Sequence, residues 1–335
     1  RSSWVTGVQT CALPISGRET GGGQMKGMEL SIRYFEQYGL SMLREHFAEE
    51  LKYMACGLVG EGSECFGYDD EFSQDHDFGP GFCIWVPIRI YERIGEKLQK
   101  AYDELPKSFM GYERVPSSMA GKRVGVLPME TFYTRFTNCG LFPSDNMNWM
   151  RIPENNLAIV TNGKVFMDNY GEFSKAREHL LNFYPEDVLR KKIAARVAIM
   201  AQSGQYNYYR CIKRGENVAA YQACAEFVKT ALSCVFLLNG RYAPFYKWTF
   251  RAANELTKLR SAVHGIERLT KIPDDMGTGA EKRDIMENIC TDVAEELRVR
   301  NFSSSRDNFL QMHLGEIMSG ISDVRIRSMH VMEDC

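Results

Sequence analysis

The sequence predicts an α+β fold, with a small sheet in the first half of the chain and a helical bundle in the second. Between residues 54 and 86, apolar runs at 58–59 and 82–86 flank a glycine-rich segment, a pattern typical of strand, turn and strand. From Phe173 to about Leu269 the apolar residues recur at helical spacing almost throughout, as they do in a bundle. We therefore expect one domain over residues 29–172 and a second, helical domain over residues 173–335.

The composition is that of an ordinary globular protein. Its 335 residues, 44% of them hydrophobic and 12% aromatic, suffice for a sizeable core and two domains. The 41 basic and 43 acidic side chains leave a net charge of -2, which gives no broad attraction for nucleic acid or for an anionic membrane. Long nucleic acid is therefore a poor candidate for the substrate.

Cysteine usage and hydropathy indicate a cytoplasmic protein. The ten cysteines are scattered without a Cys-x-x-Cys pair, which predicts free thiols rather than disulfides or a zinc site. No run reaches the roughly 18 to 20 apolar residues that a membrane span needs. Residues 1–24 lack periodicity and resemble translated adapter sequence, so we expect translation to begin at Met25 or Met28 and residues 1–28 to lie outside the fold.

The elements of the first domain follow from apolar spacing. Residues 29–51 predict one or two helices, and residues 87–105 predict an amphipathic helix that Pro106 stops. Its apolar face is formed by Ile90, Ile94, Leu98 and Tyr102.

A short strand, a short helix and a hairpin complete this domain. Residues 123–129 predict the strand, and residues 131–139 predict the helix. Two further apolar runs, 157–160 and 164–167, are joined by Thr161-Asn162-Gly163, which predicts a β-hairpin.

In the second domain we expect helices broken at Pro185, at 214–215 and at 240–244. A loop at 272–279 is expected to precede helices over about 281–299 and 304–321.

A glycine-serine pair followed by two carboxylates is the main functional motif. The apolar residues 58–59 lead to Gly62 and Ser63, and Asp75 and Asp77 follow after a spacer of eleven residues, before the apolar run 82–86. Side chains alternate along a strand, so Asp75 and Asp77 would share a face and could hold Mg²⁺, which prefers oxygen ligands and phosphates. Gly62 would let the backbone approach a triphosphate, and Ser63 would add its hydroxyl and amide at a helix start.

Another interpretation of this stretch stays open. A Gly-rich acidic loop in which Asp69, Asp70 and Glu71 form a solvated face would show much the same composition. The flanking apolar strands favour the nucleotide site over this loop.

At these residues the chain resembles the nucleotidyltransferase superfamily, whose members include DNA polymerase β and the aminoglycoside nucleotidyltransferases. The stretches GEGSECFGYDDEFSQDHDFGPGF, NGKVFMDNYGEF, YPEDV, QSGQYNYYR and NGRYAPFYKW resemble more closely the DUF4037 family of predicted bacterial nucleotidyltransferases. The resemblance covers most of the chain from about Glu29 and implies a polymerase-β-like domain followed by a C-terminal helical bundle. One departure is His76, since the superfamily has an apolar residue between its carboxylates.

The resemblance also implies a third carboxylate on a neighbouring strand, which would complete the metal site and act as a base. Asp168 and Glu130 are the candidates, and we favour Asp168 because it closes a clear strand. The competing interpretation of Asp168 is a turn residue that caps the following loop.

Three residues of the helical domain are further candidates. Gln205 and Tyr208 would share a helix side and line either an acceptor pocket or an interdomain contact. Lys247 stands in an aromatic run and resembles the basic residue that the helical domain of the aminoglycoside enzymes supplies to the triphosphate. The alternative for Lys247 is a lysine that reaches water from a helix end.

Arg306 and His313 resemble the loose Arg-x(4 to 6)-His ribonuclease motif of HEPN domains. A helical chain with this content of arginine and histidine often produces such a pair by chance.

Together these features predict a nucleotidyltransferase that uses two Mg²⁺ ions. It would transfer a nucleoside monophosphate, AMP from ATP, to a hydroxyl of a small molecule or protein, without a membrane or long nucleic acid as partner. The alternative from another class is a non-catalytic nucleotide sensor or an antitoxin-like component of a defence system.

Overall fold

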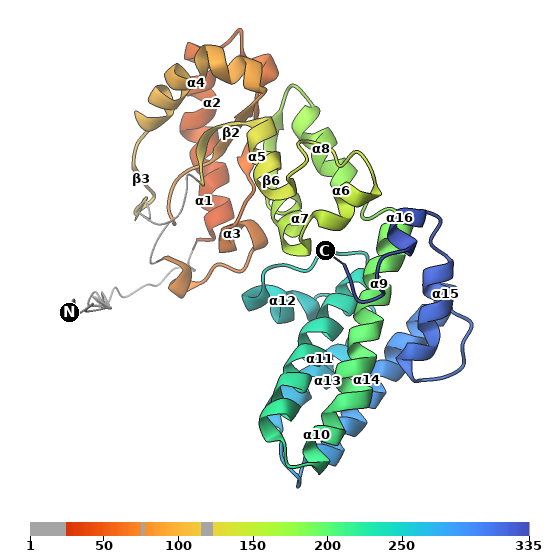
Figure 1. The fold of residues 1–335 in the computed structure, drawn as a ribbon. Coiled ribbons are helices and arrows are strands. Elements are labelled where there is room, and N and C mark those ends of the chain that lie inside the picture. Colours follow the sequence, from red (N-terminus) through yellow and green to blue (C-terminus); the bar gives the residue numbers. More distant parts are fainter. Residues whose placement is uncertain (1–24, 75–77, 115–122, 335) are drawn as a thin grey trace, which may run out of the picture.

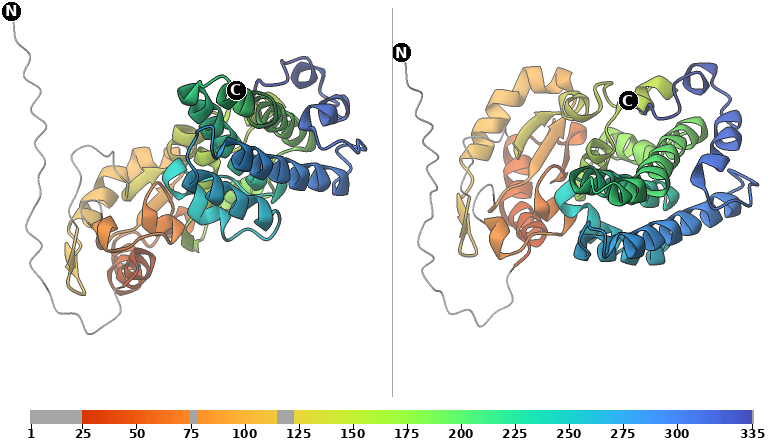
Figure 2. Two further views of the ribbon diagram at one scale, coloured as in Figure 1. Left: turned by 90° about the horizontal axis from the view of Figure 1, so that it is seen from below. Right: turned by 60° about the horizontal axis from the view of Figure 1, so that its bottom comes forward.

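The computed structural model describes residues 25–74, 78–114 and 123–334. A small sheet and its helices form the N-terminal half, and a helical bundle forms the C-terminal half (Figure 1). The views of Figure 2 show the same division, with the red-to-yellow segments on one side and the green-to-blue helices on the other. The predicted α+β class, with a small sheet before the bundle, is confirmed.

Four short strands form the sheet in the order β5-β2-β1-β6. They are β1 (Ala55–Leu58), β2 (Cys83–Val86), β5 (Gly125–Pro128) and β6 (Lys164–Asp168). β1 pairs antiparallel with β2 and β6, while β2 and β5 are parallel. The strands predicted around residues 58, 82–86, 123–129 and 164–167 are all present. β1 lies earlier than the predicted run 58–59, because it already ends at Leu58. A separate pair, β3 (Ser108–Phe109) and β4 (Tyr112–Glu113), forms a small hairpin.

The N-terminal half contains eight α-helices in its described residues: α1 (Gly27–Tyr34), α2 (Leu40–His46), α3 (Ser63–Phe66), α4 (Ile88–Asp103), α5 (Met129–Thr137), α6 (Asn146–Arg151), α7 (Glu154–Thr161) and α8 (Glu172–Leu181). A short π-helical segment, Phe35–Gly39, joins α1 to α2, and single 3-10 turns lie at Leu51–Tyr53 and Glu71–Gln74.

The sheet is covered on both faces. Cys56, Ile84 and Val126 belong to a core formed with α1, α2 and α4. The alternate residues of the same strands face the other way, where Trp85 stacks on Phe173 of α8 with 4.0 Å between the ring centroids. Burial on both faces explains why β1 and β2 are apolar throughout rather than alternating with polar residues.

The hairpin predicted at residues 157–167 is wrong in its first arm. Residues 157–160 lie in helix α7, which begins after Pro153. All four of these residues are buried, so the apolar run has no amphipathic period that could distinguish a helix from a strand. Pro153 at the helix start is the local signal that the prediction overlooked. The second arm, β6, pairs with β1 instead of with a hairpin partner.

The C-terminal half is a bundle whose α-helices, in the described residues, are α9 (Glu186–Met200), α10 (Tyr209–Lys213), α11 (Asn217–Leu238), α12 (Tyr246–Ala253), α13 (Arg260–Lys271), α14 (Gly279–Val299), α15 (Leu314–Ser319) and α16 (Val324–Arg327). A π-helical segment, Ala201–Tyr208, connects α9 to α10, and a 3-10 turn, Leu310–His313, precedes α15. The predicted breaks near Pro185, 214–215 and 240–244 are confirmed. The helix expected over 304–321 is shorter, because residues 304–309 form a loop whose Ser304 N–H donates to Glu316.

Helix α11 lies at the centre of this bundle and packs against α9 and α13. Length and composition alone would let α11 cross a membrane, but core helices of folded domains share these properties. Its side chains between Thr230 and Leu238 are almost all buried against other helices. The structure therefore uses α11 as a core helix.

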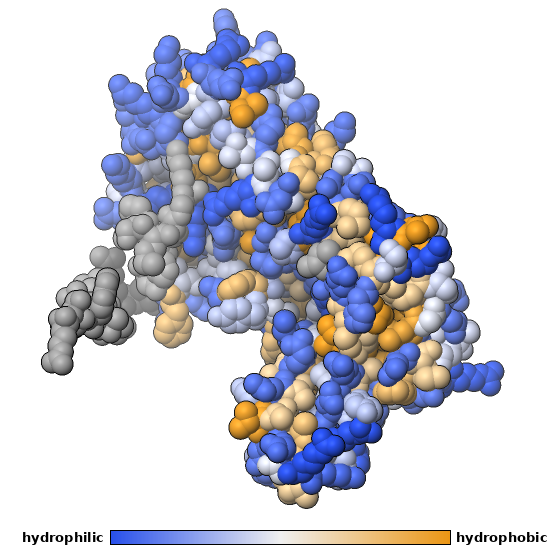
Figure 3. Space-filling model, viewed as in Figure 1, coloured by the Kyte–Doolittle hydropathy of each residue, from blue (hydrophilic) through white to orange (hydrophobic). Residues whose placement is uncertain are grey.

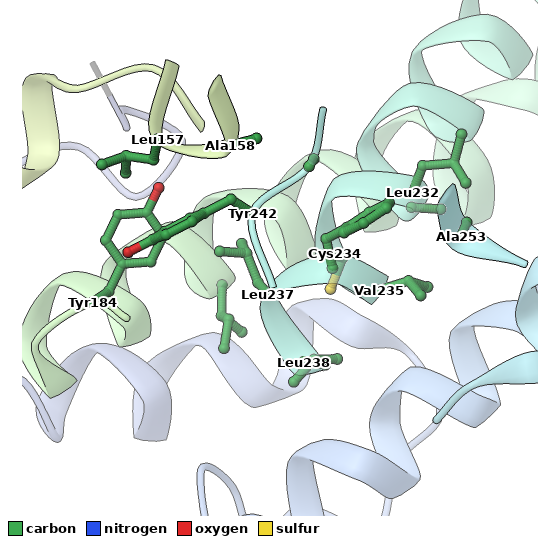
Figure 4. Packing of buried hydrophobic residues seen from close by; sticks show 14 of the residues in the cluster. Leu157, Ala158, Tyr184, Leu232, Cys234, Val235, Leu237, Leu238, Tyr242 and Ala253 are labelled. Carbon is green, nitrogen blue, oxygen red and sulfur yellow. The ribbon is translucent and has the colours of Figure 1, made fainter. Parts of the chain in front are cut away.

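One apolar core runs from the sheet into the bundle without interruption. It joins α5, α7 and α8 to α9, α11 and α14. At the junction the rings of Tyr184 and Tyr242 lie 5.2 Å apart, between Leu157 of α7 and Leu237 of α11 (Figure 4). On the face drawn in Figure 3, hydrophobic residues reach the surface mainly over the bundle, and the outer end of the N-terminal half is largely hydrophilic.

Candidate functional site

Four strand ends meet at one edge of the sheet. Gly57 of β1 lies opposite Cys83 of β2, and Cys83 pairs in turn with Gly125 of β5. Leu58 of β1 lies opposite Lys164 of β6. The C-terminal end of β1 and the N-terminal ends of the other three strands therefore share this edge, which we call the motif edge.

The predicted glycine-serine turn lies at the motif edge. After β1 the chain passes Gly60 and reaches Gly62, a buried residue with the extended backbone of a helix cap (φ -69°, ψ 148°). Ser63 begins α3, so the predicted helix start is confirmed. A turn between a strand and a helix start directs backbone N–H groups outward, which is the geometry that phosphate-binding turns use.

The turn that precedes β6 fixes the position of this loop. The Asn162 side chain accepts from the Gly60 N–H at 3.1 Å and donates to the Gly60 carbonyl at 2.7 Å. The N–H of Gly163 donates to the carbonyl of Cys65 in α3 at 2.9 Å. Asn162 and Gly163, about 100 residues further along the chain, thus bind the residues on either side of Gly62 and Ser63.

A carboxylate lies over this helix start. A Cβ added to Gly62 would be 2.1 Å from Oε1 of Glu64, so the Glu64 side chain folds back over the glycine. Burial raises the pKa of the Glu64 carboxyl, and its own N–H, Arg123 and Arg114 offset part of this effect. A phosphate at Gly62 would therefore have to displace or neutralise Glu64.

Asp69 is a buried residue rather than part of a solvated acidic face. It is 3% exposed, and its Oδ2 accepts from the Gly27 N–H at the start of α1, at 2.8 Å. Oδ1 lies 3.8 Å from Nζ of Lys26 and has no hydrogen-bond partner among the described residues. The alternative of a solvated Asp69, Asp70 and Glu71 is thus wrong for Asp69, although the other two side chains are exposed.

Asp75 and Asp77, the predicted metal ligands, lie outside the described residues. The chain is described again from Phe78, whose buried ring lies near Gly27 and α3. Within the described ranges no three His, Cys, Asp or Glu side chains gather closely enough to hold a metal ion. Among the described residues, therefore, no other side-chain cluster takes the place of Asp75 and Asp77 as the predicted ligands of Mg²⁺.

Arg114 and Arg123 are basic residues near the turn that the sequence analysis did not select. Both lie close enough to Glu64 for their charges to lower its pKa, and Arg114 donates to the Pro80 carbonyl at 3.0 Å. Guanidinium groups beside such a turn suit the binding of phosphate oxygens. Their sequence neighbourhood contains no motif, because only folding brings them to α3.

Asp168, the favoured third carboxylate, lies at the opposite edge of the sheet. It pairs with Ala55 at the beginning of β1, away from the motif edge. Its two carboxylate oxygens accept from the N–H groups of Gly171 at 2.7 Å and Ser174 at 2.8 Å. Asp168 therefore caps the turn into α8, as the competing interpretation expected.

Glu130 also lies away from the motif edge. It follows β5, whose last residue, Pro128, pairs with Val86 at the end of β2. The Glu130 Oε2 accepts from the Ile88 N–H at 2.8 Å, at the start of α4. The structure brings neither candidate third carboxylate to the glycine-serine turn.

Lys247 is carried by a helix that contacts α3. Trp248 packs on Phe66 with 5.0 Å between the ring centroids, and Arg251 donates to the Tyr68 carbonyl at 3.2 Å. The Lys247 side chain is exposed, with Nζ 4.4 Å from the centre of the Trp248 ring. It is therefore a solvated cation on a helix that packs against α3, not a lysine buried among aromatic residues.

Gln205 forms contacts within the bundle. Its Nε2 donates to Glu287 at 2.7 Å and to the Asn308 carbonyl at 3.0 Å, and its Oε1 accepts from the Leu310 N–H at 2.9 Å. With these partners the Gln205 amide joins the π-helical segment to α14 and to the loop before α15. These hydrogen bonds lie within the helical domain. They form neither the acceptor pocket nor the interdomain contact that the sequence suggested for Gln205.

Tyr208 is fully buried inside the bundle. Its hydroxyl interacts with Asp274, and burial raises the tyrosine pKa above its ordinary value. Asp274 in turn lies 2.6 Å from Nζ of the buried Lys282. Neither Gln205 nor Tyr208 lines a cavity described below, so the structure does not support them as an acceptor pocket.

The HEPN-like pair also does not form a site. Arg306 is exposed, whereas His313 is fully buried with Nε2 2.9 Å from the Asp307 carbonyl oxygen. The two side chains therefore face different environments.

A cavity of about 330 Å³ lies between α3 and the bundle. Its lining includes Phe66 and Tyr68 after the glycine-serine turn, Asn162, and Arg241 and Glu255 from the bundle. Because Asn162 also holds Gly60, this cavity lies close to the glycine-serine turn.

The fold and the motif edge thus define an α+β protein with a glycine-serine turn beside a helical bundle. A family model described as "Domain of unknown function (DUF4037)" matches residues 149–249, from α6 into α12. The match supports the family predicted from the sequence and covers Asp168, Gln205 and Lys247 but not Gly62 or Ser63. No curated protein matches this chain.

Proposed function

We propose that this protein is a Mg²⁺-dependent nucleotidyltransferase that transfers AMP from ATP to a hydroxyl group. The observation that supports the proposal best is the position of the glycine-serine turn. The turn follows β1 at the edge where β2 begins, and Asp75 and Asp77 shortly precede β2 in the sequence. This arrangement matches the strand, turn and carboxylate pair on which the superfamily resemblance rests.

In this proposal the turn orients the triphosphate. Gly62 lets the β- and γ-phosphates approach the backbone, and the amide and hydroxyl of Ser63 donate to their oxygens. Asp75 and Asp77 would hold the Mg²⁺ ions, which neutralise phosphate charge when bound. The acceptor oxygen forms its bond to the α-phosphorus as the bond to pyrophosphate breaks, and the hydroxyl proton is released to water.

The bundle would contribute the remaining contacts. Lys247 is exposed on the helix that packs against α3, so its flexible side chain could contact a phosphate. Arg114 and Arg123 would add positive charge near the turn. The balanced overall charge favours a compact acceptor, a small molecule or a protein side chain, over long nucleic acid. The scattered cysteines without a Cys-x-x-Cys pair favour a cytoplasmic location.

One observation favours a second candidate function, a nucleotide sensor without turnover. Glu64 lies over the start of α3, and both Asp168 and Glu130 lie at the opposite edge of the sheet. A site that lacks the third carboxylate could bind Mg-ATP and yet transfer nothing.

Asp77→Asn tests the transferase proposal. With α-labelled ATP, Mg²⁺ and cell extract as the source of acceptors, the variant should transfer label at least roughly 100-fold more slowly, because one metal ligand is lost. Transfer is measured as label in the small-molecule and macromolecular fractions.

Asp70→Asn is the matched control, since Asp70 is an exposed carboxylate five residues before Asp75 whose Oδ1 accepts from Phe72 and Ser73 in its own turn. It should transfer label at the wild-type rate. Mg-ATP binding without transfer in the wild type would favour the sensor, and equal transfer by Asp77→Asn and wild type would contradict the metal-ligand role.

A further inference from the structure

A cavity of about 1150 Å³ lies within the C-terminal half. It is bordered by α9, α11, the beginning of α12 and the loop between α13 and α14. None of Gly62, Ser63 and Lys247 lines it, so it is separate from the proposed nucleotide site. Its volume slightly exceeds the range of about 300 to 1,000 Å³ that is usual for ligand sites.

One face of α11 forms the apolar wall of this cavity. Ala225, Val228 and Leu232 line the cavity at three- and four-residue spacing, which places them on the same side of the helix. Ile199 of α9 and Leu269 of α13 complete the wall from neighbouring helices. The middle of the cavity therefore offers contacts to an apolar body rather than to a polar one.

An ion-pair cluster lies at one end of the wall. Arg196 donates from Nη2 to Glu154 at 2.8 Å and from Nη1 to the Asp334 carboxylate. Its Nε donates to the hydroxyl of Ser233 on α11 at 2.8 Å. All four residues line the cavity, and their charges are directed toward one another.

A second ion pair lies at the other end of the wall. Nζ of the buried Lys282 is 2.6 Å from the Asp274 carboxylate and donates to the Ile272 carbonyl at 3.1 Å. Lys282 also interacts with the Cys224 thiol of α11, which marks the position of this pair along the helix.

The two clusters bound the apolar length that is open to a ligand. Cys224 and Ser233 are nine residues apart on α11, which corresponds to about 13 Å at a rise of about 1.5 Å per residue. This length suits a flat body of roughly two to three aromatic rings.

The remaining charged side chains of the lining also have partners. Lys229 lies 3.9 Å from Glu226, Lys271 lies 2.6 Å from Glu267, and Lys192 donates to the Met150 carbonyl at 3.4 Å. A charged ligand would have to displace such a partner or be buried without one of its own, and both cost free energy. An uncharged ligand avoids this cost.

The rim of the cavity is aromatic. Tyr221 and Tyr246 are 64% and 80% exposed, an unusual degree of exposure for large aromatic side chains. The ring of Phe245 lies 4.4 Å from that of Tyr246, between centroids, and it also lines the cavity. Rings at an opening suit the entry and stacking of a flat body.

We propose that this cavity is a second ligand site, for a small uncharged molecule with a flat apolar body, held along α11 between the Arg196 and Lys282 ion pairs. The site is independent of the proposed nucleotidyl transfer.

The first test locates binding with N-phenyl-1-naphthylamine, an uncharged probe whose fluorescence rises in apolar surroundings. The wild type should bind it, and Ala225→Trp should weaken binding by at least about tenfold, because the indole fills the cavity from an exposed position of its lining. Gln222→Trp is the matched control, since Gln222 is exposed on the same helix and lies outside the lining. It should bind the probe as the wild type does.

The second test determines the charge that the site accepts. At pH 7, 1-naphthol, 1-naphthoate and 1-naphthylmethylamine share one ring system and are uncharged, anionic and cationic. The naphthol should displace the probe from the wild type at a concentration at least about tenfold lower than either charged compound.

Three results would overturn the proposal. They are a wild type that does not bind the probe, equal binding by Ala225→Trp and Gln222→Trp, and displacement by a charged naphthalene as efficient as that by 1-naphthol.

Discussion

At the residue scale, Glu64 places a carboxylate at the glycine-serine turn. Its carboxylate lies against Gly62, and burial raises its pKa. A raised carboxyl pKa means that the folded state binds more protons than the unfolded state, so folding is favoured more at low pH. This contribution is fully present below the ordinary pKa of about 4.5 and is lost as the pH rises through the raised value.

Glu64→Gln should therefore stabilise the protein at pH 7 and change little at pH 4. The amide keeps the shape of the side chain but needs no proton to be neutral. The measurement is the melting temperature of both proteins between pH 4 and pH 8. Glu36→Gln, at an exposed position, is the control and should follow the wild type. A wild-type curve parallel to that of Glu64→Gln would show that Glu64 titrates as it does in the unfolded chain.

At the element scale, the turn between α7 and β6 holds the glycine-serine loop in place. Gly163 has a φ of +62°, and a Cβ at this position would lie 2.0 Å from the Leu58 carbonyl oxygen. Asn162 bonds both polar groups of Gly60 from the same turn. The geometry of the motif edge thus depends on a turn about 100 residues further along the chain.

Gly163→Ala should destabilise the protein by more than about 2 kcal/mol, because a methyl group would both strain the backbone and displace β1. Urea unfolding followed by circular dichroism measures this loss. Gly171→Ala is the matched control, with a similar φ of +79° but no atom within 4 Å of its Cβ. It should lose only about 1 kcal/mol. Equal losses in the two variants would mean that backbone strain alone acts at Gly163.

At the scale of the whole molecule, the apolar core does not divide at residue 172, where we expected a domain boundary. Phe173 lies immediately after it and stacks on Trp85 of the sheet, and its carbonyl accepts from the Tyr133 hydroxyl at 3.1 Å. The same core continues through α8 and α9 into α11. The sheet and the bundle should therefore unfold together.

Phe173→Ala should cost about 3 to 5 kcal/mol, the usual loss for a buried phenylalanine. In urea, tryptophan fluorescence and circular dichroism should each report the same single transition, because Trp85 lies in the sheet and Trp248 in the bundle, and both halves contain helices. Leu181→Ala, at a half-exposed position of the same helix, should change stability by less than about 0.5 kcal/mol. Two separate transitions would contradict the shared core.

The sequence by itself determined the local elements of this protein. The apolar runs, the proline breaks and the Gly62-Ser63 pair were sufficient for the four sheet strands, the amphipathic α4 and the start of α3, because each depends on neighbouring residues. Residues 157–160 were assigned to a strand because complete burial removes the helical period.

The tertiary structure alone decided which side chains meet. Strand pairing placed Asp168 and Glu130 at the edge away from the turn, and it brought Arg114 and Arg123 to Glu64. Chain folding also placed Asp334 against Arg196, some 138 residues apart. Such contacts depend on pairing register and on packing between distant segments, which leave no local pattern in the sequence.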